Sequence, residues 1–139
     1  MNARSEIFEH TADIGLRVFA DTLPELLIEA GRGLMGLMVE NAPTAQPQIA
    51  IPITLPGRHH EELLADWLSE LLYLFEVRHL VLCDFNVELT PEGLHGTVKG
   101  ETLDQQRHRI AHEVKAVTYH RLSVQQINGQ WVAEVIFDI

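Results

Sequence analysis

The segment EELLADWLSELLYLFEV, residues 61–77, decides the fold class of this chain. Its apolar side chains recur at helical spacing and form one continuous stripe, made of Leu64, Trp67, Leu68, Leu71, Leu72 and Phe75. A second helix is predicted over residues 22–38, because Thr22, Pro24 and Glu25 have the order of an N-terminal cap. Both helices are too apolar to stand alone in water, so each must cover a sheet.

Short turns divide the rest of the chain into strands. Strands are predicted over residues 6–9, 15–20, 49–55, 85–89, 94–99, 122–127 and 131–138. Asn128-Gly129 is a favourable two-residue hairpin turn between the last two of these strands. Pro52 indicates that its strand lies at a sheet edge or contains a bulge. We therefore expect one α+β domain over residues 1–139, with antiparallel β-sheets packed against two main helices.

Two further segments are less regular. Residues 100–109 are polar and are predicted to form a solvent-exposed loop. Residues 113–120 contain Lys115, one of only two lysines. This segment fits either a short helix or the start of a strand, because its apolar periodicity favours neither.

The charge balance limits the classes of partner. Acidic residues outnumber basic ones by 20 to 10, which gives a net charge of −10. Proteins grip nucleic acids through cationic groups that displace counterions from phosphates, so no direct grip on RNA or DNA is expected. Any role near RNA should pass through a protein partner with a basic face.

Cysteine usage and hydropathy indicate the compartment. The single cysteine, Cys83, excludes an internal disulfide and a cysteine-based zinc site, and is expected to be a small buried hydrophobe. Charged residues near the start argue against a secretory segment, and no apolar run is long enough to cross a membrane. We expect a cytoplasmic protein.

A glycine-rich pattern in residues 31–36, GRGLMG, matches the spacing of a dinucleotide-binding loop. Such a loop must lie between a strand and a helix start, so that backbone amides face the pyrophosphate. Here the glycines fall late in the first predicted helix, and no acidic residue lies about 20 positions further on. We expect them to permit close packing or to loosen the helix end.

Eight histidines suggest a zinc site at first sight. His108 and His112 are four residues apart, as on one helix face, but Arg109 follows His108 and the zinc-protease motif is absent. Isolated surface histidines are common, and the sequence names no group that would orient these as ligands. A transition-metal site is therefore not expected.

Carboxylates near both ends of the chain are better candidates for a site. Alternation along the last strand puts Asp138 on the face of Ile136, so it should be a semi-buried carboxylate in need of a partner. The partner could be a backbone amide or Lys115. It could equally be a hard cation, Mg²⁺, Ca²⁺ or Mn²⁺, held by oxygens of Asp13 and Asp138 and a main-chain oxygen of Ile139. Chemistry alone leaves these alternatives even.

Four blocks of sequence, in order, resemble the archease family. They are HTADIG at 10–15, WLSELL at 67–72, VKAVTYH at 114–120 and VIFDI at 135–139. Gly100-Glu101 followed by Asp104 and His108 also looks like the family's polar loop. The blocks span almost the whole chain, and four in register are hard to obtain by chance.

The resemblance implies an α+β fold and a non-catalytic accessory protein of the RtcB-type RNA ligase, in tRNA splicing or RNA repair. That ligase joins RNA ends carrying a 2′,3′-cyclic or 3′-phosphate and a 5′-hydroxyl, and the accessory protein promotes its GTP-dependent guanylylation and multiple turnover. A divalent cation, often calcium, would lie near the two chain ends. Carried over by position, its ligands would be Asp13, Asp138 and Ile139, with Lys115, His10 and His120 as neighbours that contact the partner or a phosphate.

A different class of function uses the same carboxylates. A small metal-dependent phosphoester hydrolase would employ Asp13 and Asp138 with His10 or His120 as the general base. Such an enzyme needs a pocket that excludes water and holds substrate. The chain contains no recognisable phosphate-cradling loop, so the accessory role is favoured.

Overall fold

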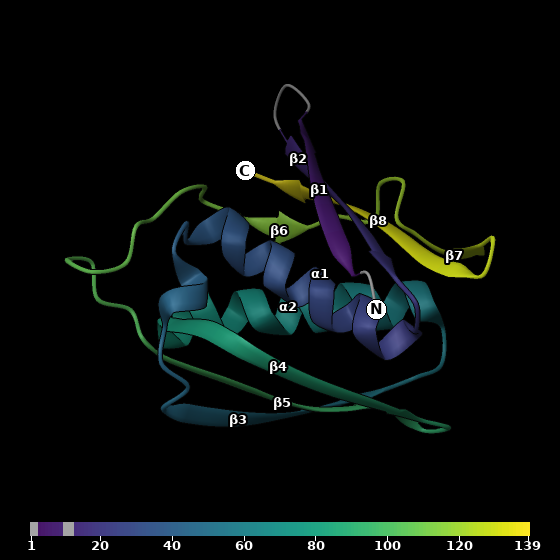
Figure 1. Ribbon diagram of the computed structural model, residues 1–139, viewed down its shortest axis with the longest axis horizontal. Coiled ribbons are helices and arrows are strands. Elements are labelled where there is room, and N and C mark those ends of the chain that lie inside the picture. Colours follow the sequence, from purple (N-terminus) through teal and green to yellow (C-terminus); the bar gives the residue numbers. More distant parts are fainter. Residues whose placement is uncertain (1–2, 10–12) are drawn as a thin grey trace.

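The computed structural model describes residues 3–9 and 13–139. Two helices lie side by side between two antiparallel sheets and give three layers, which confirms the predicted α+β class (Figure 1). The helices are α1 (Leu23–Met38) and α2 (His60–Arg78), and a short 3-10 turn, η1, spans Ala42–Thr44. The larger sheet contains β1 (Arg4–Glu9), β2 (Asp13–Ala20), β8 (Gln130–Asp138) and β6 (Ala116–Val117) in that order, with β7 (Ser123–Ile127) paired to β8. The smaller sheet has the order β3 (Ile49–Pro56), β5 (Gly93–Thr102), β4 (Leu80–Thr90).

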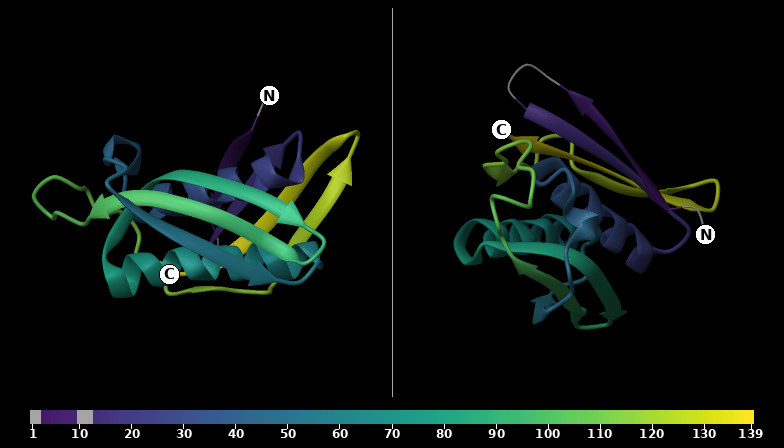
Figure 2. Two further views of the ribbon diagram at one scale, coloured as in Figure 1. Left: turned by 90° about the horizontal axis from the view of Figure 1, so that it is seen from below. Right: turned by 60° about the vertical axis from the view of Figure 1, so that its left-hand side comes forward.

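The helices form a middle layer, which explains their apolar sequences. α1 contacts β2 of the larger sheet and β4 of the smaller one, and α2 contacts β6 and β4 in the same way (Figure 2). The helices also touch each other, because the fully buried Trp67 donates its Nε1–H to the main-chain oxygen of Leu27 at 2.7 Å. Each helix therefore covers two sheets rather than the one sheet that its stripe required.

The start of α1 follows its sequence signals. Thr22 accepts a hydrogen bond from the Glu25 amide at 3.3 Å and donates its own hydroxyl to the Glu25 carboxylate at 3.0 Å. The glycines in the second half of this helix serve packing. A Cβ at Gly33 would lie 2.7 Å from Leu16 Cδ2, and one at Gly31 would lie 3.0 Å from Leu71 Cδ1. The glycines of the dinucleotide-like pattern thus allow α1 to lie close to β2 at Gly33 and close to α2 at Gly31.

Several strand boundaries differ from the predictions. β4 begins at Leu80, five residues earlier than expected, and β5 continues to Thr102, so residues 100–102 belong to a strand. The undecided segment around Lys115 contains only the two-residue strand β6. Pro52 lies on the edge strand β3, as predicted. Asn128 and Gly129 both have positive φ, 53° and 78°, as a tight hairpin turn between β7 and β8 requires.

Two expectations from composition can be compared with the structure. In the described part of the chain, no helix combines the length and apolar character that crossing a membrane requires. Cys83 packs against the core but stays partly exposed, so it is less buried than predicted. Burial raises the pKa of its thiol, which keeps it protonated at neutral pH.

Candidate functional site

The candidate site lies where the end of β8 meets the start of β2. These strands are antiparallel, and their register places Asp13 directly opposite Asp138 and Ile14 opposite Phe137. Opposite residues in such a pair project from the same face of the sheet, with Cβ atoms about 4.5–5.5 Å apart. The fold therefore brings the two aspartates together although 125 positions separate them (138 − 13).

The two carboxylates differ in burial. On β8 the fully buried Ala133, Val135 and Phe137 face the helices, so Asp138 belongs to the opposite, outer face together with Ile136. Asp138 is exposed there, not semi-buried as predicted, because the strand ends beside open solvent. Asp13 is the half-buried member of the pair.

Asp13 carries the feature that calls for a ligand. Its Oδ1 atom is buried and has no hydrogen-bond partner in residues 3–9 and 13–139. A buried carboxylate oxygen without a donor is unfavourable, and a hard cation satisfies such an oxygen directly. The residues present therefore fit a divalent cation in chemistry and position.

The described side chains would only partly surround such an ion. Within residues 3–9 and 13–139 no group of three or more histidine, cysteine, aspartate or glutamate side chains could hold a metal. Ca²⁺ takes about six to eight oxygen ligands. Asp13 and Asp138 would need water, main-chain oxygens or a partner to complete that number. Ile139, the third ligand that the resemblance implies, follows Asp138 and is 38% exposed.

Lys115 joins the site through its main chain. Its N–H donates to the main-chain oxygen of Asp138 at 2.8 Å, and the next residue, Ala116, is the register partner of Asp138. Its side chain is exposed and forms no ion pair with a carboxylate of the described residues. The salt bridge considered from sequence is thus not formed among the described residues. The exposed Lys115 side chain lies with residues of α2 along a groove next to β6.

For the two histidines named with the site, the described residues show no contact with the aspartates. His10 lies outside the described residues. His120 is exposed in the turn after β6, where its N–H donates to Thr118 Oγ1 at 3.3 Å. Among the described contacts, none joins the His120 ring to Asp13 or Asp138.

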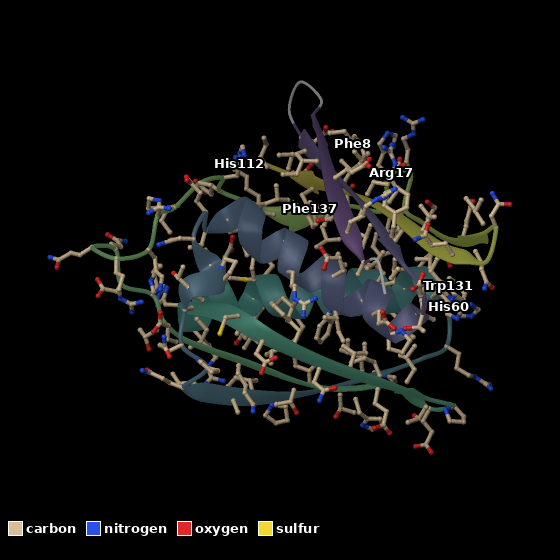
Figure 3. All side chains as sticks on the ribbon, viewed as in Figure 1. Phe8, Arg17, His60, His112, Trp131 and Phe137 are labelled. Carbon is tan, nitrogen blue, oxygen red and sulfur yellow. The ribbon has the colours of Figure 1, made fainter. Side chains whose placement is uncertain are left out.

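The outer face behind the aspartates is held by aromatic and ionic contacts. A Cβ at Gly15 would overlap the ring of Phe8, its register partner on β1, so glycine lets the ring lie flat on the sheet. Arg17 lies over the Phe8 ring, 4.9 Å from its centroid, and pairs with Glu134 at 3.0 Å (Figure 3). These contacts join β1, β2 and β8, and so fix the strands that position the site.

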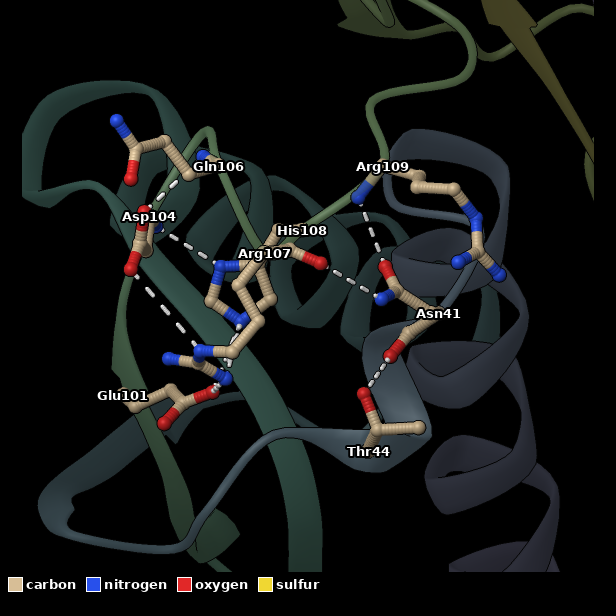
Figure 4. A network of polar contacts seen from close by, with 8 residues as sticks. All are labelled: Asn41, Thr44, Glu101, Asp104, Gln106, Arg107, His108 and Arg109. Carbon is tan, nitrogen blue, oxygen red and sulfur yellow. Dashed lines mark hydrogen bonds and ion pairs between the residues drawn. The ribbon is translucent and has the colours of Figure 1, made fainter.

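A second polar cluster was missed at the sequence level, where residues 100–109 were expected to be exposed. The His108 side chain is fully buried and Glu101 is 3% exposed (Figure 4). His108 Nδ1 accepts the Asp104 amide at 2.9 Å, so Nε2 carries the proton and donates to Glu101 at 2.8 Å. Arg107 donates to the same carboxylate oxygen at 2.6 Å and is the main reason that the pKa of Glu101 falls to about 2.

The segment between β5 and β6 is tied to the end of α1. Asn41 donates to the main-chain oxygen of Arg107 at 3.0 Å and accepts the Arg109 amide at 2.8 Å. The amides of Ala111 and His112 donate to the main-chain oxygens of Met38 and Leu37, which have no partner further along the helix. His112 is therefore used through its backbone, and the expected absence of a zinc role for the His108–His112 pair stays a prediction.

Comparison with known proteins gives the relationship. The Archease protein family (MTH1598/TM1083) matches this chain over residues 6–139. The chain belongs to the archease family. Curated archeases of Methanopyrus kandleri and Pyrococcus furiosus are 40% and 37% identical to it, each over 96% of this chain. The matches cover 98% and 97% of those two proteins, so the relationship extends over their whole length.

Solved structures agree with the archease fold. The solution structure of protein 1598 of Methanobacterium thermoautotrophicum has a TM-score of 0.80 and 27% identity, and the match covers 97% of this chain and 98% of that one. A crystal structure from Thermotoga maritima, described as an archease and possible chaperone, has a TM-score of 0.68 at 20% identity over both full chains. The second comparison supports the fold alone.

Proposed function

We propose that this protein is a non-catalytic activator of an RtcB-type RNA ligase. It promotes the GTP-dependent guanylylation of the ligase and allows repeated turnover in tRNA splicing or RNA repair. In this proposal, activation of the ligase depends on a divalent cation held by Asp13, Asp138 and a main-chain oxygen of Ile139. Family membership supports an accessory role. The identity of the partner as an RNA ligase and the role of the cation are our additions to it.

One observation carries the proposal: the register pairing of Asp13 with Asp138 beside a buried, unpartnered Asp13 oxygen. A cation held by oxygen ligands supplies positive charge that neutralises phosphate oxygens. The ligase's own site provides the nucleotide and RNA phosphates. The exposed Lys115 ammonium is a second positive group that can reach a phosphate or the partner.

Charge supports action through a protein partner. The net charge of −10 opposes direct contact with an RNA backbone, whereas a basic face on a ligase would be attracted. A hydrolase with the same carboxylates needs a general base within hydrogen-bond reach. Of the two candidate bases, His120 has no described contact with either aspartate, which disfavours it in that role, and His10 lies outside the described residues.

The test is reconstitution with an RtcB-type ligase from the same genome. The ligase, GTP and an RNA with 2′,3′-cyclic phosphate and 5′-hydroxyl ends are incubated with and without this protein. We expect faster guanylylation and repeated ligation, which Asp13→Ala and Asp138→Ala abolish while circular dichroism stays unchanged. Asp84→Ala, an exposed position on β4, is the matched control. Unchanged ligation with wild-type protein would refute the activator, and hydrolysis of phosphoesters by this chain alone would favour the hydrolase.

A further inference from the structure

An open groove of about 330 Å³ runs between α2 and β6, next to the candidate site. Tyr73, Glu76 and Val77 line it from α2, and Lys115 and Val117 line it from the β6 side. We propose that this groove docks a segment of the protein partner in which an apolar side chain is flanked by lysines or arginines. The inference rests on the proposed function, since it names the surface by which the ligase is held.

The α2 wall offers two apolar anchors. Tyr73 is 51% exposed and Val77 is 56% exposed, although both belong to a helix whose neighbouring Leu71, Leu72 and Leu74 are buried. Their spacing of four residues places them on the same helix face. Single exposed hydrophobic residues are ordinary, but a tyrosine and an aliphatic residue that share one groove form a binding surface. Tyrosine in particular is enriched among residues that dominate binding energy.

Acidic side chains continue the same face of α2. Glu62, Asp66 and Glu76 are exposed, and their spacings of four, seven and three residues along the series that includes Tyr73 place them on its helix face. None of the three pairs with a cation in the described part of the chain. Their charge attracts lysine or arginine side chains and repels phosphates, so the charge complementarity favours a basic protein segment over RNA.

The groove is directed toward the candidate site. Lys115 forms part of its wall, and the Lys115 amide is bonded to the main-chain oxygen of Asp138 at 2.8 Å. Basic side chains of the docked segment are repelled by Lys115 and attracted by Glu76 and Asp66, which orients the segment along α2. The Lys115 end is left open to an anionic group of the partner's site. Docking here therefore places the end of β8, which carries Asp138, close to that site.

The experiment measures the affinity of the full-length protein for the RtcB-type ligase by calorimetry. Tyr73→Ala removes one anchor, and Val77→Arg places a cation where the segment's apolar side chain sits, so each should weaken binding at least about ten-fold. Ile127→Arg is the matched control, because Ile127 is 47% exposed at the β7–β8 turn, and it should stay within about two-fold of wild type. Both groove positions are half exposed, and thermal melting verifies that the variants remain folded.

A charge-reversal pair tests the chemistry of the partner. Glu76→Lys should weaken binding mainly at low salt, whereas Glu92→Lys at the exposed β4–β5 turn should not. If Tyr73→Ala and Val77→Arg bind and stimulate the ligase normally, the groove is not the docking surface, although the proposed function still holds. A wild-type protein that neither binds nor stimulates the ligase would overturn both. Labelled single-stranded RNA that binds wild type but not Tyr73→Ala would show that the groove takes RNA and overturn the assigned partner.

Discussion

Asp13 and Asp138 differ in how deeply their carboxylates are buried. Asp13 lies in the half-buried start of β2 and keeps an oxygen without a donor, whereas Asp138 is exposed on the last strand. In the absence of an ion the buried charge on Asp13 opposes folding, because a carboxylate loses hydration when it is buried. The cation that we propose at this point would offset that cost, because its positive charge would lie against the carboxylate oxygens. The proposed site therefore links stability to ion binding at one residue.

That linkage predicts the behaviour of Asp13→Asn. Calcium at about 100 times its dissociation constant should stabilise the wild-type protein by about 2.7 kcal/mol. The amide variant removes the buried charge, so its Tm without calcium should equal or exceed that of wild type, and added calcium should not raise it. Scanning calorimetry with and without calcium measures both effects, with Asp84→Asn as the exposed control. Calcium stabilisation retained in Asp13→Asn would show that the ion binds elsewhere.

Gly15 gives a second prediction at the level of one residue. A methyl group there would overlap the Phe8 ring and push it from the sheet, so Gly15→Ala should destabilise the fold by about 1–3 kcal/mol. Gly36→Ala in α1 is the contrasting control, because no atom lies within 4 Å of the position that the new methyl group would take and alanine favours a helix. That change should stabilise the fold by about 0.5–1 kcal/mol. Urea unfolding measures the free energy of unfolding of both variants. An equal change in that free energy for Gly15→Ala and Gly36→Ala would contradict the packing role of Gly15.

At the scale of elements, the segment from Leu103 to Lys115 is fixed without regular structure. Glu101 and His108 anchor its first half, and the C-terminal end of α1 anchors its middle. Its last residue is held at Asp138. Main-chain and side-chain hydrogen bonds to neighbouring elements therefore replace those that a helix or strand would have supplied within this segment.

Glu101 makes this anchoring sensitive to acid. Its pKa lies at about 2, below the ordinary 4.5, chiefly because Arg107 hydrogen-bonds to the carboxylate. A carboxylate with a lowered folded pKa stabilises the fold above its unfolded pKa and loses that effect as pH falls through the folded value. Glu101→Gln should thus cost roughly 1–3 kcal/mol at pH 7. The difference from wild type should shrink between pH 4.5 and about 2.

Denaturant unfolding at pH 7 and pH 3 tests this expectation. Glu88→Gln on the exposed face of β4 serves as the control and should change stability little at either pH. If Glu101→Gln and wild type differ equally at both pH values, the ionised carboxylate is not the anchor.

The elements that the sequence predicts well are those with local causes. The Thr22 cap, the Asn128-Gly129 turn and the Pro52 edge strand each depend on a few neighbouring residues, and all three are confirmed. The burial of His108 has no local signal, because it depends on Glu101 in a strand and on Asp104 across a turn. A polar segment thus resembles a solvated loop until its partners are placed in space.

At the scale of the whole molecule, the fold pairs the second strand, β2, with the last strand, β8, and leaves a groove between α2 and β6. Alternation along β8 predicted which residues share a face with Asp138, but it could not predict that β2 is the neighbouring strand. Long-range pairing leaves no periodic trace in one sequence. The resemblance supplied that proximity, and the structure places Asp13 opposite Asp138. The groove along α2 was not foreseen, since Tyr73 and Val77 belong to an otherwise buried apolar stretch.

The proposed function assigns ion binding to the aspartates and partner contact to the groove, and Lys115→Ala tests this separation. The Lys115 amide, which bonds to Asp138, is kept in the variant, while the exposed ammonium is lost. Removing this positive charge should leave calcium affinity equal or higher, because the ammonium can only repel a bound cation. Ligase stimulation should be lost. Lys99→Ala on the outer face of β5 is the control with the only other lysine of the chain. Calorimetric calcium binding that weakens in Lys115→Ala would mean that the ammonium supports the ion site itself, and stimulation that persists would mean that it has no part in the contact.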